Sequence, residues 1–343
     1  MKKNLMLLIV LIVLTIIAGG IYYLTGGSSG NLGEVYSDFA FQDTSMVTRI
    51  YLADTDGQTI DLKRKDDGRF WSVNDKFNAR EDAVRLLLKT FKRIKVKGPV
   101  PKTTQETVVK MIAGRGVRVE IFTADGLSKT YLIGTCTQDH FGTYMVLERA
   151  DGARSSEPLI MHMEGFTGCL RQRFFTNEEE WRYTGIFDHP ELDISKVEVI
   201  NHEHPESSFN IRYAGGNDLS LHSTFVHRDL PIFDTLAVKD YLLKYKKVHL
   251  ETYESHLPLA GEDSLLNVLP AFTIRVTNDK GIDKKIDLYW KKPIKSQLGP
   301  DGEVMKWDGD RMYGVVGNDV VLVQRYTFNP LLIGIEQFAP PLY

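Results

Sequence analysis

The sequence predicts an α+β protein, with an N-terminal transmembrane helix followed by two tandem, duplicated modules of antiparallel sheet, each covered by one long helix. Two observations predict this fold. An uncharged apolar run fills residues 5–24, and the rest of the chain shows the same order of strand-like and helix-like patterns twice. With 343 residues, the chain is also long enough for about two domains.

The run from Leu5 to Leu24 is long enough to cross a membrane, because about 20 helical residues rise roughly 30 Å. Lys2 and Lys3 precede it, and the next basic residue is Arg49. The positive-inside rule then leaves the N-terminus in the cytoplasm and exports everything after the run. We therefore expect a single-pass protein of the bacterial inner membrane, with its C-terminal domains in the periplasm.

A cleaved signal peptide is the alternative, with residues 5–17 as its core and the small residues 18–20 behind it. The apolar run continues to Leu24, which a cleavable signal would not need, so we favour an uncleaved signal anchor. The predicted order of segments is a cytoplasmic N-terminus (1–4), the anchor (5–24), a flexible Gly/Ser-rich tether (25–36), a first module (37–164), a structured connector (165–187) and a second module (188–343).

The duplication is clearest in one amphipathic helix. Residues 83–96 carry apolar side chains at the spacing of one helix face, with Arg and Lys on the other face. Residues 237–250 align with them without a gap, so that Val84 meets Val238 and Phe91 meets Tyr245. A basic amphipathic helix can bind a membrane surface or a partner groove. Because the apolar stripe recurs in both copies, we interpret each helix as the cover of its own sheet.

Other segments repeat around this helix. Residues 43–47 resemble 193–197, residues 119–126 resemble 274–281, and residues 143–146 resemble 312–315. The second copy carries insertions, of which residues 291–302 are the largest and have the Pro, Gly and Lys content of a surface loop.

Turn signals place the elements of the first copy. We predict a helix starting near Asn78 with Glu81 as a capping-box partner, and a short connector helix capped by Asn177 or Thr176. The predicted strands are bounded by Asp-Gly turns and cover residues 48–53, 59–63, 70–73, 117–123 and 129–133.

Few residues suggest chemistry. Cys136 and Cys169 would lie in an oxidising compartment and could form a disulfide, or remain two buried thiols. His202 and His204 would share a strand face with His222 nearby, which makes these three the weak candidates for a metal site; exposed turn residues are the alternative, and we predict no metal. We predict no catalytic residue and no cofactor. The net charge of −3 gives no reason to expect nucleic acid.

A family resemblance rests on short structural motifs. Residues 38–45 leading to 47–52, then 70–73 and the helix start at 79–84, resemble the bacterial family catalogued as domain of unknown function 4340, over about residues 35 to 330. The resemblance implies an envelope protein of uncharacterised role, often encoded beside gliding-type ABC-transporter subunits and found in many Bacteroidota. It carries no functional residue to this chain.

We therefore expect a non-enzymatic, membrane-anchored periplasmic scaffold or accessory subunit of a multi-protein envelope assembly serving transport, secretion or motility. Its partners would be the lipid bilayer, through the N-terminal helix, and other envelope proteins. The alternative is a periplasmic module that binds glycan or lipid in a cleft between the two repeats, lined by Trp71, Trp181, Trp290 and Trp307. An enzyme would need His202, His204 and His222 to meet a carboxylate.

Overall fold

The computed structural model describes Thr15 and residues 38–65, 70–155, 157–257, 265–299 and 302–340. Apart from Thr15, the predicted membrane anchor Leu5–Leu24 and the tether 25–36 lie outside these residues. Among the residues described, no helix is both long enough and apolar enough to cross a membrane. The chain divides into two compact units between Arg182 and Tyr183, which we call module 1 and module 2.

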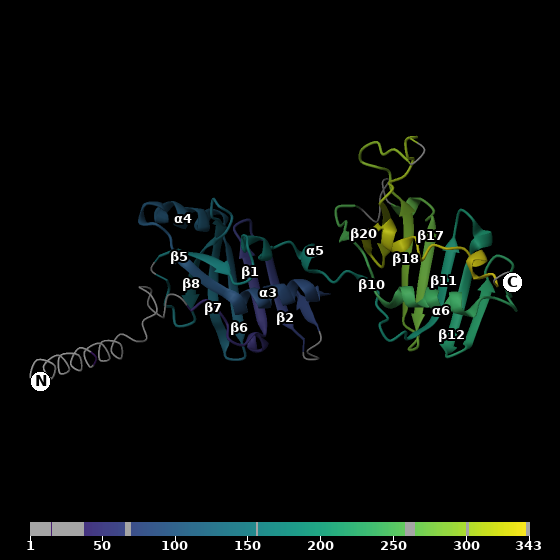
Figure 1. The fold of residues 1–343 in the computed structure, drawn as a ribbon, viewed down its shortest axis with the longest axis horizontal. Helices are drawn as coiled ribbons and strands as arrows, with labels where there is room; N and C mark the ends of the chain where they lie inside the picture. Colours follow the sequence, from purple (N-terminus) through teal and green to yellow (C-terminus); the bar gives the residue numbers. More distant parts are fainter. Residues whose placement is uncertain are drawn as a thin grey trace, which may run out of the picture. The chain divides into compact units, whose positions relative to one another are not determined.

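Module 1 is built on an antiparallel sheet, nine strands wide within the described residues, whose order is β4-β3-β2-β1-β6-β7-β8-β9-β5 (Figure 1). Its elements in chain order are η1 Thr44–Met46, β1 Arg49–Asp54, β2 Thr59–Arg64, β3 Trp71–Val73, β4 Phe77–Asn78, α3 Glu81–Arg93, β5 Ile94–Pro99, α4 Lys102–Arg115, β6 Val117–Thr123, β7 Gly126–Cys136, β8 Thr143–Arg149, β9 Leu159–Met163, η2 Arg171–Arg173 and α5 Glu178–Trp181.

Module 2 repeats this arrangement in the part of it that is described, with the strand order β14-β13-β12-β11-β17-β18-β19-β20-β16. Its elements are β10 Gly185–Phe187, β11 Ile194–Asn201, η3 Pro205–Ser207, β12 Phe209–Gly215, β13 Asp218–Ser223, β14 Arg228–Asp229, α6 Thr235–Leu243, η4 Lys244–Lys246, β15 Val248–His249, β16 Thr252–Tyr253, η5 Leu265–Asn267, β17 Phe272–Asn278, β18 Asp283–Trp290, β19 Arg311–Val316, β20 Asp319–Gln324, α7 Arg325–Phe328 and η6 Ile335–Phe338.

The registers of the two sheets agree with the sequence repeat at its later strands. Ile133 pairs with Met145, and their aligned residues Leu288 and Gly314 pair in the same way.

The first strand is different. The sequence alignment matched Val47 with Val197, but the sheet places Ile50 at the position of Val197. Ile50 pairs with Leu62 and Ile121, as Val197 pairs with its two neighbours. Three residues of shift would reverse the inward and outward faces of the strand, so the alignment there was wrong.

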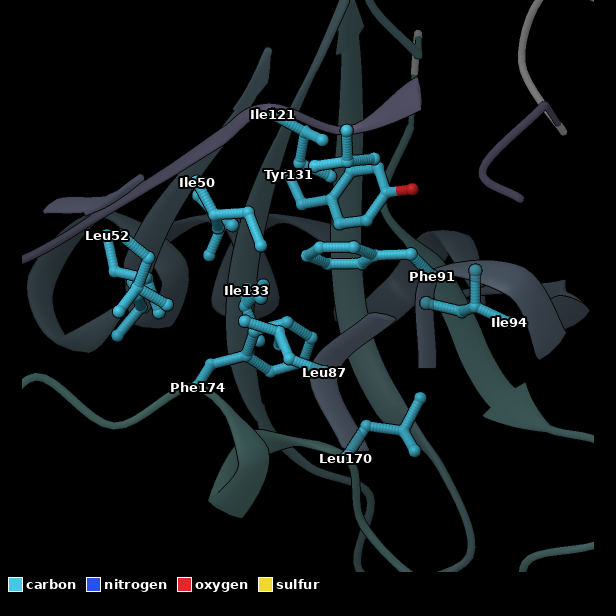
Figure 2. Close-up of a cluster of buried hydrophobic side chains, with 14 of the residues drawn as sticks. Ile50, Leu52, Leu87, Phe91, Ile94, Ile121, Tyr131, Ile133, Leu170 and Phe174 are labelled. Carbon is cyan, nitrogen blue, oxygen red and sulfur yellow. The ribbon is translucent and has the colours of Figure 1, made fainter. Parts of the chain in front are cut away.

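The core of module 1 lies between the sheet and α3. Val84, Leu87 and Phe91 are the buried apolar residues of this helix, one on each successive turn of its inner face. Figure 2 shows the ring of Phe91 beside Tyr131 of β7, and their centroids are 5.7 Å apart. Phe174 lies on the other side of Phe91, at 6.3 Å. The helix is therefore core, as its apolar stripe predicted.

The opposite face of the same sheet is covered by α4. On β7, Tyr131 and Ile133 belong to the cluster under α3, while Leu132 between them packs with Val108 and Ile112 of α4. Alternate residues of a strand point to opposite faces, so the two helices lie on the two sides of the sheet. The sequence analysis did not predict α4.

The predicted single long helix per module is wrong in two ways. The helices are short, since α3 has 13 residues and α6 has 9. The stripe that was expected to continue to Val96 ends at Arg93, because Ile94–Pro99 forms β5 and pairs with β9. The start was also misplaced: Asn78 lies in β4, and Arg80 precedes the helix without a side-chain cap.

The predicted connector contributes to both modules. Asn177 caps α5 by accepting a hydrogen bond from the Glu179 N–H at 2.9 Å, which confirms that part of the prediction. Trp181 at the end of α5 is fully buried in the core of module 1, whereas β10 starts module 2. The structure also joins Cys136, at the end of β7, to Cys169 in a disulfide with a Cα–Cα distance of 5.4 Å.

Candidate interaction surface of module 2

One loop sets module 2 apart from module 1. β18 and β19 are joined by residues 291–310, whereas the aligned strands β7 and β8 are joined only by residues 137–142. Figure 1 shows the longer loop extending away from the end of the sheet. It contains the insertion that the sequence repeat revealed. We call residues 291–310 the β18–β19 loop.

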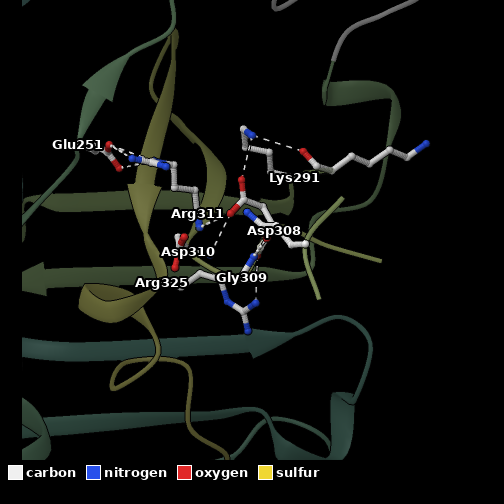
Figure 3. Close-up of polar contacts among 9 residues, drawn as sticks. Glu251, Lys291, Asp308, Gly309, Asp310, Arg311 and Arg325 are labelled. Carbon is white, nitrogen blue, oxygen red and sulfur yellow. Dashed lines mark hydrogen bonds and ion pairs between the residues drawn. The ribbon is translucent and has the colours of Figure 1, made fainter. Parts of the chain in front are cut away.

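The base of this loop is closed by a buried ion pair. The Nζ of Lys291 lies 3.1 Å from Oδ2 of Asp308, and the two side chains are only 8% and 5% exposed. The Asp308 N–H also donates to the Lys291 carbonyl at 2.8 Å, which continues the ladder of the two strands into the loop. The two arms of the loop are therefore joined by both backbone and side chains (Figure 3).

Asp308 also organises the turn into β19. Its Oδ1 accepts hydrogen bonds from the N–H groups of Asp310, at 2.9 Å, and Arg311, at 3.2 Å. Burial opposes ionisation of this carboxyl, but these hydrogen bonds and the Lys291 ammonium outweigh it and hold the pKa of Asp308 below its ordinary value. The carboxylate is therefore the charged form that this turn is built around.

A second layer of polar contacts surrounds the pair. Arg311 donates to both oxygens of Glu251 at distances of 2.8 to 3.0 Å, and this hydrogen bonding raises the pKa of its guanidinium. Arg325 donates to the Asp308 carbonyl at 3.2 Å. Within the loop, the Oε1 of Gln297 accepts from the Gly309 N–H at 2.8 Å. Arg–carboxylate pairs of this bidentate kind fix orientation as well as charge.

Aromatic rings support the loop from the side of β18. Trp290, the last residue of β18, stacks on Trp307 of the loop with a centroid distance of 6.2 Å. The Arg325 guanidinium lies 5.3 Å from the Trp290 ring, and the Lys306 ammonium lies 4.9 Å from the Trp307 ring. The Trp290 N–H donates to Glu203 at 3.0 Å. Both rings are therefore engaged within the module.

The outer part of the loop exposes aliphatic side chains. Ile294 is 89% exposed, Leu298 68% and Val304 66%. Loop arms fixed by the contacts above thus carry apolar groups into solvent. The exposed lysines of the same loop are Lys292, Lys295 and Lys306. Apolar residues that fill no core in a well-anchored loop are typical of a surface that binds another molecule.

A hollow of about 570 Å³ lies beside the base of the loop. Tyr313 and Leu322 line it from the sheet, and Glu254 and Lys295 line its rim. In module 1, Tyr144 occupies the position of Tyr313 and packs into the α4 cluster. The hollow is therefore on the face that α4 covers in module 1.

The three histidines predicted as weak metal ligands lie at different partners. His202 contacts Thr273 Oγ1 at 3.0 Å, and His222 contacts Asp229 at 2.9 Å. His204 lies 3.5 Å from Glu206. Among the described residues, no group of three or more His, Cys, Asp or Glu side chains is placed to hold a metal.

The tryptophans are used within their own modules. Trp71 and Trp181 belong to the buried core of module 1, and Trp290 and Trp307 stack on each other in module 2. Sequence reasoning identified residues 291–302 as a surface loop but missed its anchor, because Lys291 and Asp308 show no motif in the sequence.

Comparison of the chain with family models, with curated proteins and with solved structures finds no match.

Proposed function

We propose that this protein is a non-enzymatic subunit of a multi-protein assembly in the bacterial envelope, anchored in the inner membrane by residues 5–24. The observation that carries the proposal is the β18–β19 loop, whose base is fixed by the Lys291–Asp308 pair and whose outer part exposes Ile294, Leu298 and Val304. The site is suited to presenting a surface, since its charged residues are used to hold the loop.

Rigid presentation favours binding for a physical reason. A loop that is already ordered loses little conformational entropy when a partner covers it. Ile294 alone is 89% exposed, so covering it removes most of its apolar surface from water. The exposed Lys292 and Lys295 beside it favour a partner groove that is apolar in its centre and acidic at its rim.

Two further observations support an exported protein. The uncharged run before the tether is long enough to span a bilayer, with the only nearby basic residues on its N-terminal side. The Cys136–Cys169 disulfide suits an oxidising compartment such as the periplasm.

The test is site-specific photo-crosslinking in native membranes. A photo-reactive residue at Ile294 should give a discrete adduct with a second protein. The matched control is Ile282, which is also exposed, at 57%, but lies in the turn between β17 and β18. It should give no such adduct.

Affinity purification provides a second readout. The variant Ile294→Ser/Leu298→Ser/Val304→Ser should lose the partner that wild type retains, and Ile282→Ser should keep it. Recovery of the wild-type protein alone, in mild detergent and after crosslinking, would refute the proposal.

A further inference from the structure

Module 1 has a groove that the proposed function leaves unused. It lies along the outer face of α3, has a volume of about 560 Å³ and runs past Thr44 of η1. Its apolar lining includes Trp71, Val84 and Leu88. Its charged lining comes from four basic residues of α3 and one acidic residue, namely Arg85, Lys89, Lys92, Arg93 and Glu81.

Two of these cations make no ion pair among the described residues. Arg85 lies 3.7 Å from Glu81, but both side chains are more than 70% exposed, so the pair contributes little. No ion pair within the described part of the chain includes Lys89 or Lys92. The groove therefore combines an apolar floor with unneutralised positive charge.

The fold does not require this charge. α6 of module 2 aligns with α3 and covers an equivalent sheet, yet it has Leu243 at the position of Lys89. Lys239, at the position of Arg85, is engaged with Asn217 at 2.7 Å. Only the inward residues recur, so the basic rim is specific to module 1.

The chain also reaches module 1 beside this groove. The Phe41 N–H donates to the Phe91 carbonyl of α3 at 2.9 Å, and Thr44 lines the groove. From Leu24 to Asp38 the chain can span at most roughly 50 Å when fully extended. Module 1 is thus held close to the membrane that residues 5–24 would span.

We propose that the α3 groove docks onto anionic phospholipid headgroups of the membrane that anchors the chain, with Lys89, Lys92 and Arg85 binding phosphate oxygens. Amines and guanidinium groups suit phosphate, and opposite charges attract strongly within about 10 Å of an anionic surface at moderate salt. This inference rests on the proposed anchoring, and on the charge and tether just described.

The test uses the full chain in nanodiscs of phosphatidylcholine alone, or of phosphatidylcholine mixed with phosphatidylglycerol. An amine-reactive reagent labels exposed lysines, and mass spectrometry gives the rate at each one. Lys89 and Lys92 should label several-fold more slowly in the anionic discs, and high salt should remove the difference. Lys246 and Lys247, the aligned region of α6, are the matched controls and should label equally in both discs.

Variants and a soluble anion sharpen the result. Arg85→Gln/Lys89→Gln should abolish the protection of Lys92, whereas Lys246→Gln/Lys247→Gln should leave it unchanged. Equal labelling of Lys92 in both discs overturns the inference. Equal protection by inorganic phosphate in neutral discs also overturns it, because the ligand would then be a soluble anion. If the chain co-elutes with neither disc, the proposed anchoring itself fails, and this inference with it.

Discussion

Lys291 and Asp308 form an ion pair that is almost completely removed from solvent, with 3.1 Å between Nζ and Oδ2. It closes the base of the β18–β19 loop, where the two arms would otherwise be held by backbone contacts and Gln297. Removing one partner of such a pair leaves the other charge buried without its counter-ion. The pair therefore offers a direct test of how the loop is held.

The first prediction is a coupling between the two residues. Lys291→Met should lower the free energy of unfolding of module 2 by about 3 kcal/mol, the size typical when a buried charge loses its partner. In an Asp308→Asn background the same change should cost much less, because the amide carries no charge. Hydrogen exchange of the loop and β19 amides in the four proteins gives the coupling free energy. Equal costs in both backgrounds would show that the pair does not stabilise the loop.

The second prediction concerns pH. The pKa of Asp308 is lower in the folded protein than its ordinary value, so its stabilising contribution is fully present above the unfolded value, about 3.9, and is lost as the pH falls through the folded value. The stability difference between wild type and Asp308→Asn should stay constant between about pH 5 and 7 and shrink below about pH 4. Urea unfolding at a series of pH values measures it. A difference that stays the same at the lowest pH would contradict the assignment.

Much of the fold could be predicted because local signals and the repeat agree. The hairpins at Asp56 and Asp125 have Asp-Gly turns, and α3 has a strong apolar stripe. By contrast, α4 carries Thr103, Thr104 and Thr107, whose β-branched side chains weaken the helical signal.

The rest depends on partners far away in sequence. Ile94 and Val96 fit the end of a helix stripe and also an edge strand, and only pairing with β9 decides for the strand. The β18–β19 loop was visible as an insertion, but the contact of Lys291 with Asp308 was not, because it follows from the path of the loop and from no local pattern.

The third prediction tests the disulfide. Its sequence separation is 33 residues, and the chain-entropy model gives a loss of about 3–4 kcal/mol when Cys136→Ser/Cys169→Ser opens a loop of this size. Slowly exchanging amides of module 1 should become less protected, while those of module 2 should not change. A reducing agent should reproduce the effect in wild type and have none on the double variant. Unchanged protection of module 1 after reduction would show that the disulfide does not stabilise it.

The fourth prediction ranks two buried tyrosines of module 2. The Tyr241 hydroxyl donates to the Leu331 carbonyl at 2.8 Å and lies 2.6 Å from the Tyr245 hydroxyl, which must then donate to it. Tyr241→Phe leaves both of these groups without a partner, which should cost about 1–3 kcal/mol. Tyr245→Phe removes only one donor, and Phe91 already occupies the aligned position in module 1, so it should cost about 0.5–1.5 kcal/mol.

The free energy of unfolding of module 2, from hydrogen exchange of its slowest amides, decides the order. Module 1 amides in the same samples are the control, because neither tyrosine belongs to its core. A larger cost for Tyr245→Phe than for Tyr241→Phe would mean that the hydrogen-bond chain runs in the other direction. The Leu331 carbonyl fixes the direction proposed here: it can only accept, so the Tyr241 proton must point toward it and the Tyr245 proton toward Tyr241.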